Sequence, residues 1–401
     1  MDIYQQLWDL DQPENGGSGC IVAAPDSDDV FSPANAPVHL QVQPASERGR
    51  SREHDRASLP LFAFVDDQVL QRPTYAALIR LMDNYIVNYR LEETITDEEE
   101  QEIEDFLEAI INTPVMNLAF HFVTENLGIN LSADAFRDRV MSMWFEPYTN
   151  YFNRKSTMFC SGFEHVFVGE GKYDSVFGAA ERRGEISGYH NWIKFYLDEK
   201  LGRVNFLGLR YELRGEPVPT NPNVVTLEMN WRIHDLQGGF TANLVKPKGG
   251  FFVGTSPELE IAMGTVAYFE RLAGVINGDN RFTKINGANY KLTIYANIEE
   301  DGKRGDMIRS FFPAYLGGPQ DAINTSDRPR LDNIGSHNNQ GDVRVVAALV
   351  NPAGEDEGNE WVAIINRSNA SIDLSGWKMA DASNRPEALE GEIAPGETRR
   401  F

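Results

Sequence analysis

The sequence lacks the features of three common classes of protein. It has only two cysteines, Cys20 and Cys160, far apart in the chain, so we expect neither a disulfide framework nor a zinc site. No apolar run approaches the roughly 20 residues of a membrane-spanning helix. Residues 1–12 lack the basic start and apolar stretch of a secretory signal. The sequence therefore predicts a cytoplasmic protein with reduced cysteines and no membrane contact.

Basic residues are also scarce. The chain has 37 Lys and Arg against 60 Asp and Glu, a net charge of −23, whereas nucleic-acid binding relies mostly on Lys and Arg. The distribution is uneven, however. Residues 150–310 contain 20 basic and 19 acidic residues, and the remainder contains 17 and 41. The central segment is therefore locally balanced, which permits an anionic substrate without demonstrating one.

The 401 residues, of which 41% are hydrophobic, suggest two or three domains. The fold class that the patterns predict is α+β, with a helical N-terminal lobe and a mixed α/β lobe, followed by a β domain. The sequence predicts a flexible segment at 1–58, with one short helix near its start, and a main domain at 59–320. A linker at 321–341 and a strand-rich tail at 342–401 are predicted to follow.

Individual elements have recognisable signals. Thr96 and Glu99 form a capping box ahead of an apolar helical stripe, and Ser256 precedes Pro257 at a second helix start. Residues 164–168 read as a short strand. His121 falls in an apolar helical segment and is interpreted as a core histidine.

Two histidines in aromatic surroundings suggest acid–base chemistry. His165 and His190 could supply a proton donor and a proton acceptor near neutral pH. Lys246 lies beside a Gly-rich turn where a phosphate could approach. These are the parts needed to cleave RNA through its 2′-OH without a metal, although such residues also occur together by chance. A rival, His234, is interpreted as a surface histidine.

Three motifs then point to a family. The blocks at 163–170 (FEHVFVGE), 188–196 (GYHNWIKFY) and 254–260 (GTSPELE) closely resemble the poly(U)-specific endoribonucleases of the EndoU or XendoU family. The resemblance covers about residues 60–320. It implies cleavage of single-stranded RNA at uridylates, with 2′,3′-cyclic phosphate and 5′-hydroxyl ends.

The resemblance also implies roles for residues of the main domain. His165 is the expected general acid, His190 the general base and Lys246 the third catalytic residue. Glu164 and Glu170 match carboxylates that orient the histidines or serve a Mn²⁺ requirement. The sequence has no clear ligand cluster, so it assigns no metal ligands.

The same resemblance suggests where substrate binds. Tyr315 matches a tyrosine placed against the uracil or ribose. Gly250 stands where the family often has a serine that selects uracil. We expect either Thr255 or Ser256 to compensate, or the uridine preference to be weaker.

The tail resembles a lamin-tail domain, an immunoglobulin-like sandwich, through residues 359–362 and 373–377. It has only about 60 residues against about 100 in a seven-stranded sandwich, so an abbreviated or truncated fold is expected. Its predicted role is to bind or tether a protein partner. Two other readings of the whole chain remain open, an RNA-binding module with a degenerate site and a toxin-type RNase effector.

Overall fold

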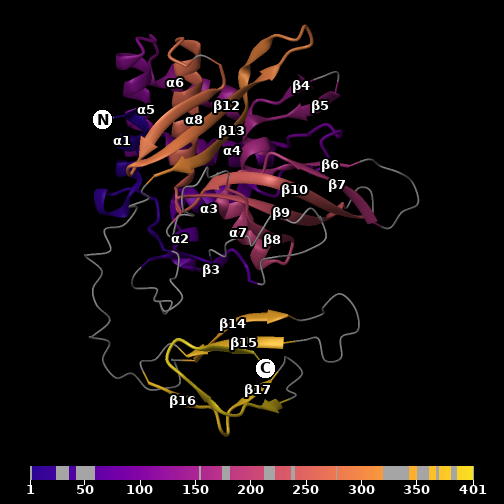
Figure 1. The fold of residues 1–401 in the computed structure, drawn as a ribbon. Helices are drawn as coiled ribbons and strands as arrows, with labels where there is room; N and C mark the ends of the chain where they lie inside the picture. The colour runs from indigo at the N-terminus through magenta and orange to yellow at the C-terminus, as the bar shows by residue number, and fades with distance from the viewer. Residues whose placement is uncertain are drawn as a thin grey trace.

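A computed structural model describes most of the chain. The described residues are 2–23, 36–41, 59–152, 155–173, 181–211, 222–235, 240–276, 278–318, 343–349, 361–366, 370–380 and 386–400. The predicted linker at 321–341 lies outside them. Figure 1 shows a mixed α and β main body, followed by a strand-rich C-terminal unit.

The helical lobe forms as the patterns predict. Thr96 and Glu99 make both hydrogen bonds of the capping box at the start of α4. The apolar stripe of this helix is buried in the main core. The helices of the lobe are α2 (Asp67–Leu70), α3 (Pro73–Leu81), α4 (Asp97–Ile111), α5 (Pro114–His121), a π-helix (Phe122–Asn126) and α6 (Ala133–Phe145).

Two sheets make up the second lobe. A five-stranded sheet has the order β6-β7-β10-β9-β8, and a three-stranded sheet has the order β11-β12-β13. The strands of the first are β6 (Glu170–Lys172), β7 (Glu181–Ser187), β8 (Val204–Leu209), β9 (Val224–Asp235) and β10 (Phe240–Phe252). Those of the second are β11 (Asn280–Ile285), β12 (Ala288–Ile298) and β13 (Arg304–Gly317). A separate hairpin pairs β4 (Tyr148–Phe152) with β5 (Lys155–Cys160).

Helix α8 (Pro257–Leu272) joins the two sheets in sequence and lies in the core. Ser256 caps its first turn and Pro257 follows at the first helical position, as expected from the sequence. Figure 1 shows α4, α5, α6 and α8 on one side of β12 and β13. Helix α7 (Trp192–Lys200) packs against β8, on the five-stranded sheet.

The N-terminal segment corrects one expectation. Residues 2–23 and 36–41 are part of the folded body, whereas residues 1–58 were predicted to be a flexible segment with only one short helix. Helix α1 (Ile3–Asp11), which contains the predicted short helix, buries its apolar side chains in the main core. A short sheet follows, made of β1 (Val22–Ala23), β2 (Val38–Leu40) and β3 (Phe62–Val65). The polar composition concealed the folding of this segment, because most of the apolar side chains in its described residues are buried.

Two local predictions were wrong. The segment Glu164–Val168 is a π-helix, because Gly169 N–H bonds back to the Glu164 carbonyl and closes a five-residue turn. His121 is exposed at the end of α5 and lies 3.0 Å from Glu125. His234 is exposed on β9, as the sequence indicated.

The C-terminal unit has its own small apolar core. Its strands are β14 (Val343–Leu349), β15 (Trp361–Asn366), β16 (Ile372–Asp373), β17 (Lys378–Ala380), β18 (Pro386–Ala388), β19 (Glu392–Ile393) and β20 (Thr398–Arg400). They form one three-stranded and two two-stranded pairings. The core consists of Ile364, Ile372, Leu374, Leu389 and Ile393.

Within the described residues, no single helix is long and apolar enough to cross a membrane. Helix α4 and the segment Pro114–Asn126 reach that length and composition only together, and they are bent by 79° at the break between them.

Candidate active site

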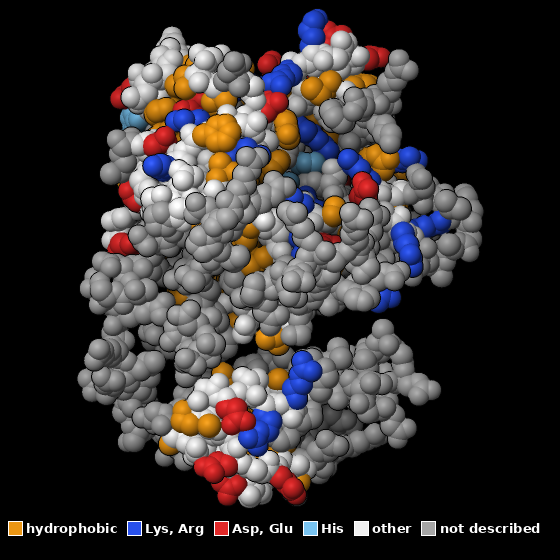
Figure 2. Space-filling model, in the orientation of Figure 1, with side chains coloured by type: hydrophobic (Ala, Val, Ile, Leu, Met, Phe, Trp, Pro, Cys, Tyr) orange, Lys and Arg blue, Asp and Glu red, His pale blue; other side chains and the backbone are white. Residues whose placement is uncertain are grey.

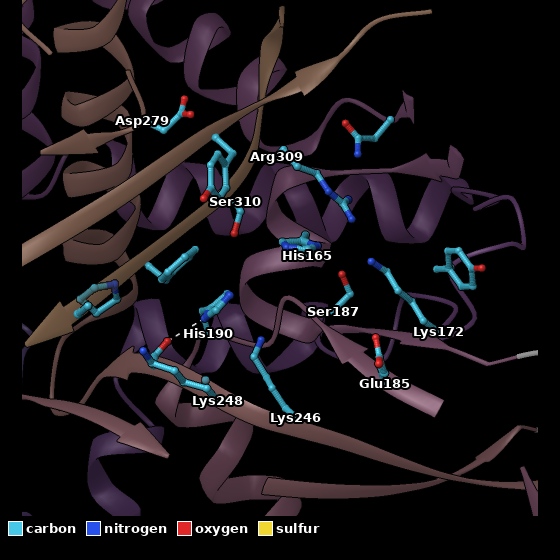
Figure 3. A pocket seen from close by; sticks show the side chains of 18 of the residues that line it. His165, Lys172, Glu185, Ser187, His190, Lys246, Lys248, Asp279, Arg309 and Ser310 are labelled. Carbon is cyan, nitrogen blue, oxygen red and sulfur yellow. Dashed lines mark hydrogen bonds between the residues drawn. The ribbon is translucent and has the colours of Figure 1, made fainter. Parts of the chain in front are cut away.

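A cavity of about 1210 Å³ opens between the two sheets, and the two predicted histidines line it. Its walls come from β6, β7 and β10 on one side and from β12 and β13 on the other. Figure 2 shows Lys and Arg side chains gathered around a hollow in which histidine is visible. Figure 3 shows His165, His190 and Lys246 pointing into the same space.

Backbone hydrogen bonds hold the two histidine segments together. The Tyr189 and His190 N–H groups donate to the His165 and Val166 carbonyls at 2.8 and 2.6 Å. Gly188 has a φ of +66°, and a Cβ there would lie 1.8 Å from the His165 carbonyl oxygen. Tyr189 also has a left-handed φ of +67°, a strained state common at functional sites. These contacts set the imidazole centroids 6.3 Å apart.

His190 is held in one tautomer. Its Nδ1 lies 2.7 Å from the Gly250 carbonyl oxygen, which can only accept, so Nδ1 carries the hydrogen. Nε2 is therefore left with its lone pair. Phe312 stacks on the ring at 4.6 Å with a 13° interplanar angle and fixes its plane. Burial, followed by the charges of Lys246 and His165, holds the pKa of His190 well below its usual value.

His165 faces a buried ion pair. Its Nδ1 lies 3.2 Å from Oε2 of Glu170, and Arg309 binds both oxygens of that carboxylate at 2.8 and 2.7 Å. Burial and the Arg309 charge lower the pKa of His165 to about 4, outweighing the opposite effect of Glu170. Burial alone would raise the pKa of Glu170, but Arg309 and His165 hold it well below its ordinary value. This carboxylate is therefore ionised and lies beside the imidazole.

Lys246 completes the group from a distorted strand. The pairing of β10 with β9 shifts between Lys246 and Gly249, which marks a β-bulge beside the lysine. Such bulges redirect side chains near active sites. Nζ donates to the Gly188 carbonyl. Burial lowers the pKa of Lys246 to about 7, with Glu170 acting against this effect. The lysine charge can therefore respond to a bound anion near neutral pH.

Comparison with known proteins identifies the family. A family model described as Endoribonuclease XendoU matches residues 26–313. The chain belongs to the XendoU endoribonuclease family.

Individual relatives agree with this assignment. The uridylate-specific endoribonuclease B of Danio rerio is 32% identical over 58% of this chain and 74% of its own. The poly(U)-specific endoribonuclease of Xenopus tropicalis is 34% identical over 67% and 81%. The solved structure of XendoU, described as a splicing-independent snoRNA-processing endoribonuclease, has a TM-score of 0.54 and 27% identity. It covers 79% of this chain and 96% of that one.

Arg309 is a site residue of this XendoU-family chain that sequence reasoning missed. The pairing of β12 with β13 steps from Tyr295–Ser310 to Ala296–Ile308, which leaves Arg309 as an extra residue in a β-bulge. The bulge turns its side chain toward Glu170. A signal was present, because a charged residue inside an otherwise apolar strand is rarely buried without a partner.

The structure places three of the predicted substrate contacts away from the cavity. Tyr315 is buried on the core side of β13, where its ring meets Tyr211 and Tyr290. Thr255 and Ser256 are also buried, one bonded to Glu260 and the other capping α8. None of the three lines the cavity. The aromatic side chain of β13 that does is Phe312, because alternate residues of a strand face opposite sides.

Gly250 lines the cavity, but its carbonyl rather than a side chain acts there. A Cβ at this position would lie 2.8 Å from the Pro313 carbonyl oxygen, so the close approach of β10 and β13 requires glycine. Glu164 is buried and accepts a hydrogen bond from the Ser161 backbone at 3.3 Å. It starts the π-helix and is not part of the short strand that was expected over residues 164–168.

The predicted carboxylates do not fit a resident Mn²⁺. Arg309 occupies both oxygens of Glu170. Burial, followed by the charge of Glu170, raises the pKa of Glu164 well above its usual value, which disfavours the ionised form that a metal ligand needs. Over the described part of the chain, no three His, Cys, Asp or Glu side chains are grouped to hold a metal ion. We therefore derive no catalytic step through a metal.

Proposed function

We propose that this protein is an endoribonuclease that cleaves single-stranded RNA on the 3′ side of uridylates. The observation that carries the proposal is the convergence of His165, His190 and Lys246 on one cavity, with His190 held in the tautomer of a base. The names of the relatives, uridylate-specific and poly(U)-specific endoribonucleases, support the choice of substrate.

In the proposed reaction, Nε2 of His190 takes the proton from the ribose 2′-OH. The 2′-oxygen then forms a bond to the adjacent phosphorus, and the bond from phosphorus to the 5′-oxygen breaks. His165 donates a proton to the departing oxygen, which leaves a 2′,3′-cyclic phosphate and a 5′-hydroxyl. Both imidazoles are neutral in the empty site because of burial and nearby cations. A bound phosphate offsets those cations and lets His165 take up its proton.

Lys246 supplies positive charge where the phosphorane oxygens gain negative charge. Its pKa of about 7 in the empty site rises when the anionic phosphate binds beside it. Glu170 positions His165, and Arg309 fixes Glu170 with two hydrogen bonds. Phe312 and the Gly250 carbonyl position the imidazole of His190. Each imidazole therefore has its own support, which preorganises proton transfer.

For the C-terminal unit we propose a lamin-tail-like tether that holds a protein partner. Its separate small core supports a role for this unit that is distinct from RNA cleavage. Deleting residues 342–401 is expected to leave kcat/KM on a short oligoribonucleotide unchanged. A loss of cleavage would contradict the proposal.

The central test uses an oligoribonucleotide with a single uridine. We expect cleavage there, with the ends described above, and no cleavage when that uridine carries a 2′-deoxyribose. His165→Ala and His190→Ala are each expected to reduce kcat/KM by about 10²–10⁴-fold while the far-UV spectrum stays unchanged. Tight RNA binding without cleavage by the wild-type chain would favour the module with a degenerate site. Parallel reactions with EDTA and with Mn²⁺ test the metal dependence that the family resemblance implies.

A further inference from the structure

The three-stranded sheet has one covered face and one open face. Arg281 of β11 reaches back to Glu270 of α8 at 3.1 Å, so the face containing Arg281 packs on the helix. The neighbouring residues Phe282 and Lys284 point the opposite way and are exposed. The side that does not meet α8 is therefore open, and we call it the open face.

Strand register extends the open face into the cavity. Phe282 pairs directly with Lys291, and Tyr295 on the same strand pairs with Ser310. The pairing is regular from Tyr290 to Tyr295, so Lys291, Tyr295 and Phe312 project on the same side as Phe282. Lys291, Tyr295 and Phe312 all line the cavity. The open face is thus continuous with the catalytic centre, where Phe312 stacks on His190.

The composition of this surface is unusual for an acidic protein. Phe282 is 61% exposed and Tyr295 is 43% exposed, both large values for aromatic side chains. The ring of Tyr295 lies 6.3 Å from that of Phe312. Lys284 and Lys291 lie on the same face. No Asp or Glu occurs in 280–284, 291–295 or 310–314, although the chain has a net charge of −23.

We propose that the open face is a binding platform for the RNA segment that flanks the scissile uridylate. Bases would stack on Tyr295 and Phe282, and Lys291 and Lys284 would contact phosphates. Exposed aromatic side chains on a sheet, flanked by cations, suit single-stranded RNA because every base has a stacking face and every linkage a charge. Strand spacing and a register offset of two residues put Phe282 about 12 Å from Phe312, two strands away, which one or two further nucleotides can span. The inference rests on the proposed function and specifies its substrate as a strand several nucleotides long.

The test compares a UpA dinucleotide with a 12-nucleotide RNA that has one central uridine. Phe282→Ala and Phe282→Leu are expected to lower kcat/KM on the 12-mer about 5- to 150-fold, the cost of one lost base stack. Cleavage of UpA should not change, because Phe282 lies outside the cavity. Phe282→Trp should keep the activity on the 12-mer. Leu201→Ala, at a residue 62% exposed after α7, is the matched control and should affect neither substrate.

A second variant tests the phosphate contact. Lys284→Ala is expected to reduce the slope of log kcat/KM against log salt by about 0.7 on the 12-mer. Lys200→Ala, which removes an exposed lysine of α7, should leave the slope unchanged. If wild type, Phe282→Ala and Lys284→Ala cleave the 12-mer equally well, the proposed RNA platform is wrong. Cleavage of UpA in the same experiment would still support the proposed endoribonuclease activity. If the Phe282 variants instead change the oligomeric state and not cleavage, the open face is a protein contact and the proposal is wrong. Failure of the wild-type chain on both substrates would reject the proposed function itself.

Discussion

Replacing Arg309 with methionine tests how the site controls the charge of His165. Arg309 forms two hydrogen bonds to Glu170, whose side chain is fully buried. Removing one partner of a buried ion pair costs about 3–5 kcal/mol because the other charge is left uncompensated. The same guanidinium is, after burial, the main factor that lowers the pKa of His165 to about 4. Without it, the carboxylate 3.2 Å away should raise the pKa of His165 from about 4 toward its usual value.

The sign of the pH dependence follows from this rise. A histidine whose folded pKa lies below its unfolded value destabilises the fold as pH falls from the unfolded pKa toward the folded one, and this penalty shrinks when the folded pKa rises. Arg309→Met should therefore lose less stability at pH 6 than at pH 8. Urea unfolding measures the free energy of unfolding, and NMR titration of the His165 ring measures its pKa.

The double variant Glu170→Gln/Arg309→Met provides the control. It removes both charges, so we expect it to recover most of the stability that the single variant loses. It should still cleave RNA poorly, because His165 no longer has an ionised carboxylate to orient it. Equal losses of stability in the single and double variants, or an unchanged pKa of His165 in Arg309→Met, would refute the reasoning.

Three further predictions follow from the same geometry. The pKa of Lys246 near 7 predicts that kcat/KM falls as pH rises above about 7. In Lys246→Arg this fall should move to higher pH because arginine stays charged, and an unmoved limb would count against the role of Lys246. Gly250→Ala should cost about 1–3 kcal/mol in urea unfolding and reduce cleavage, because the new Cβ meets the Pro313 carbonyl; wild-type values in both assays would disprove the steric requirement. Burial, followed by the charge of Glu258, raises the pKa of Asp11 to about 7. The free energy of unfolding should therefore fall as pH rises from about 3.8 to 7. Asp11→Asn should remove this dependence and add up to about 4 kcal/mol at pH 8, and parallel pH profiles of the two proteins would contradict it.

Much of the fold could be predicted from local pattern. The capping box at Thr96 and the Ser256–Pro257 helix start both form as expected, because a cap depends on residues within one turn. The π-helix at Glu164–Val168 could not be predicted in this way. Its apolar residues have the composition of a strand, and only packing and the return bond from Gly169 close the turn.

The residues expected to contact substrate also could not be predicted from local sequence. A tyrosine near the end of β13 was an attractive base contact, yet alternation along the strand turns Tyr315 into the core and Phe312 into the cavity. A shift of one position along a strand reverses the face, and motif spacing alone does not settle which residue points where.

The sequence by itself determined the family, the predicted catalytic residues and most of the helices, because motifs and caps are short-range patterns. Only the tertiary structure decided which groups each predicted catalytic residue faces. The bulges at Arg309 and beside Lys246, and the Gly250 carbonyl against His190, depend on how separate strands pair. Strand pairing joins residues far apart in the chain, so neither the proton on His190 nor the open face beside it follows from local sequence.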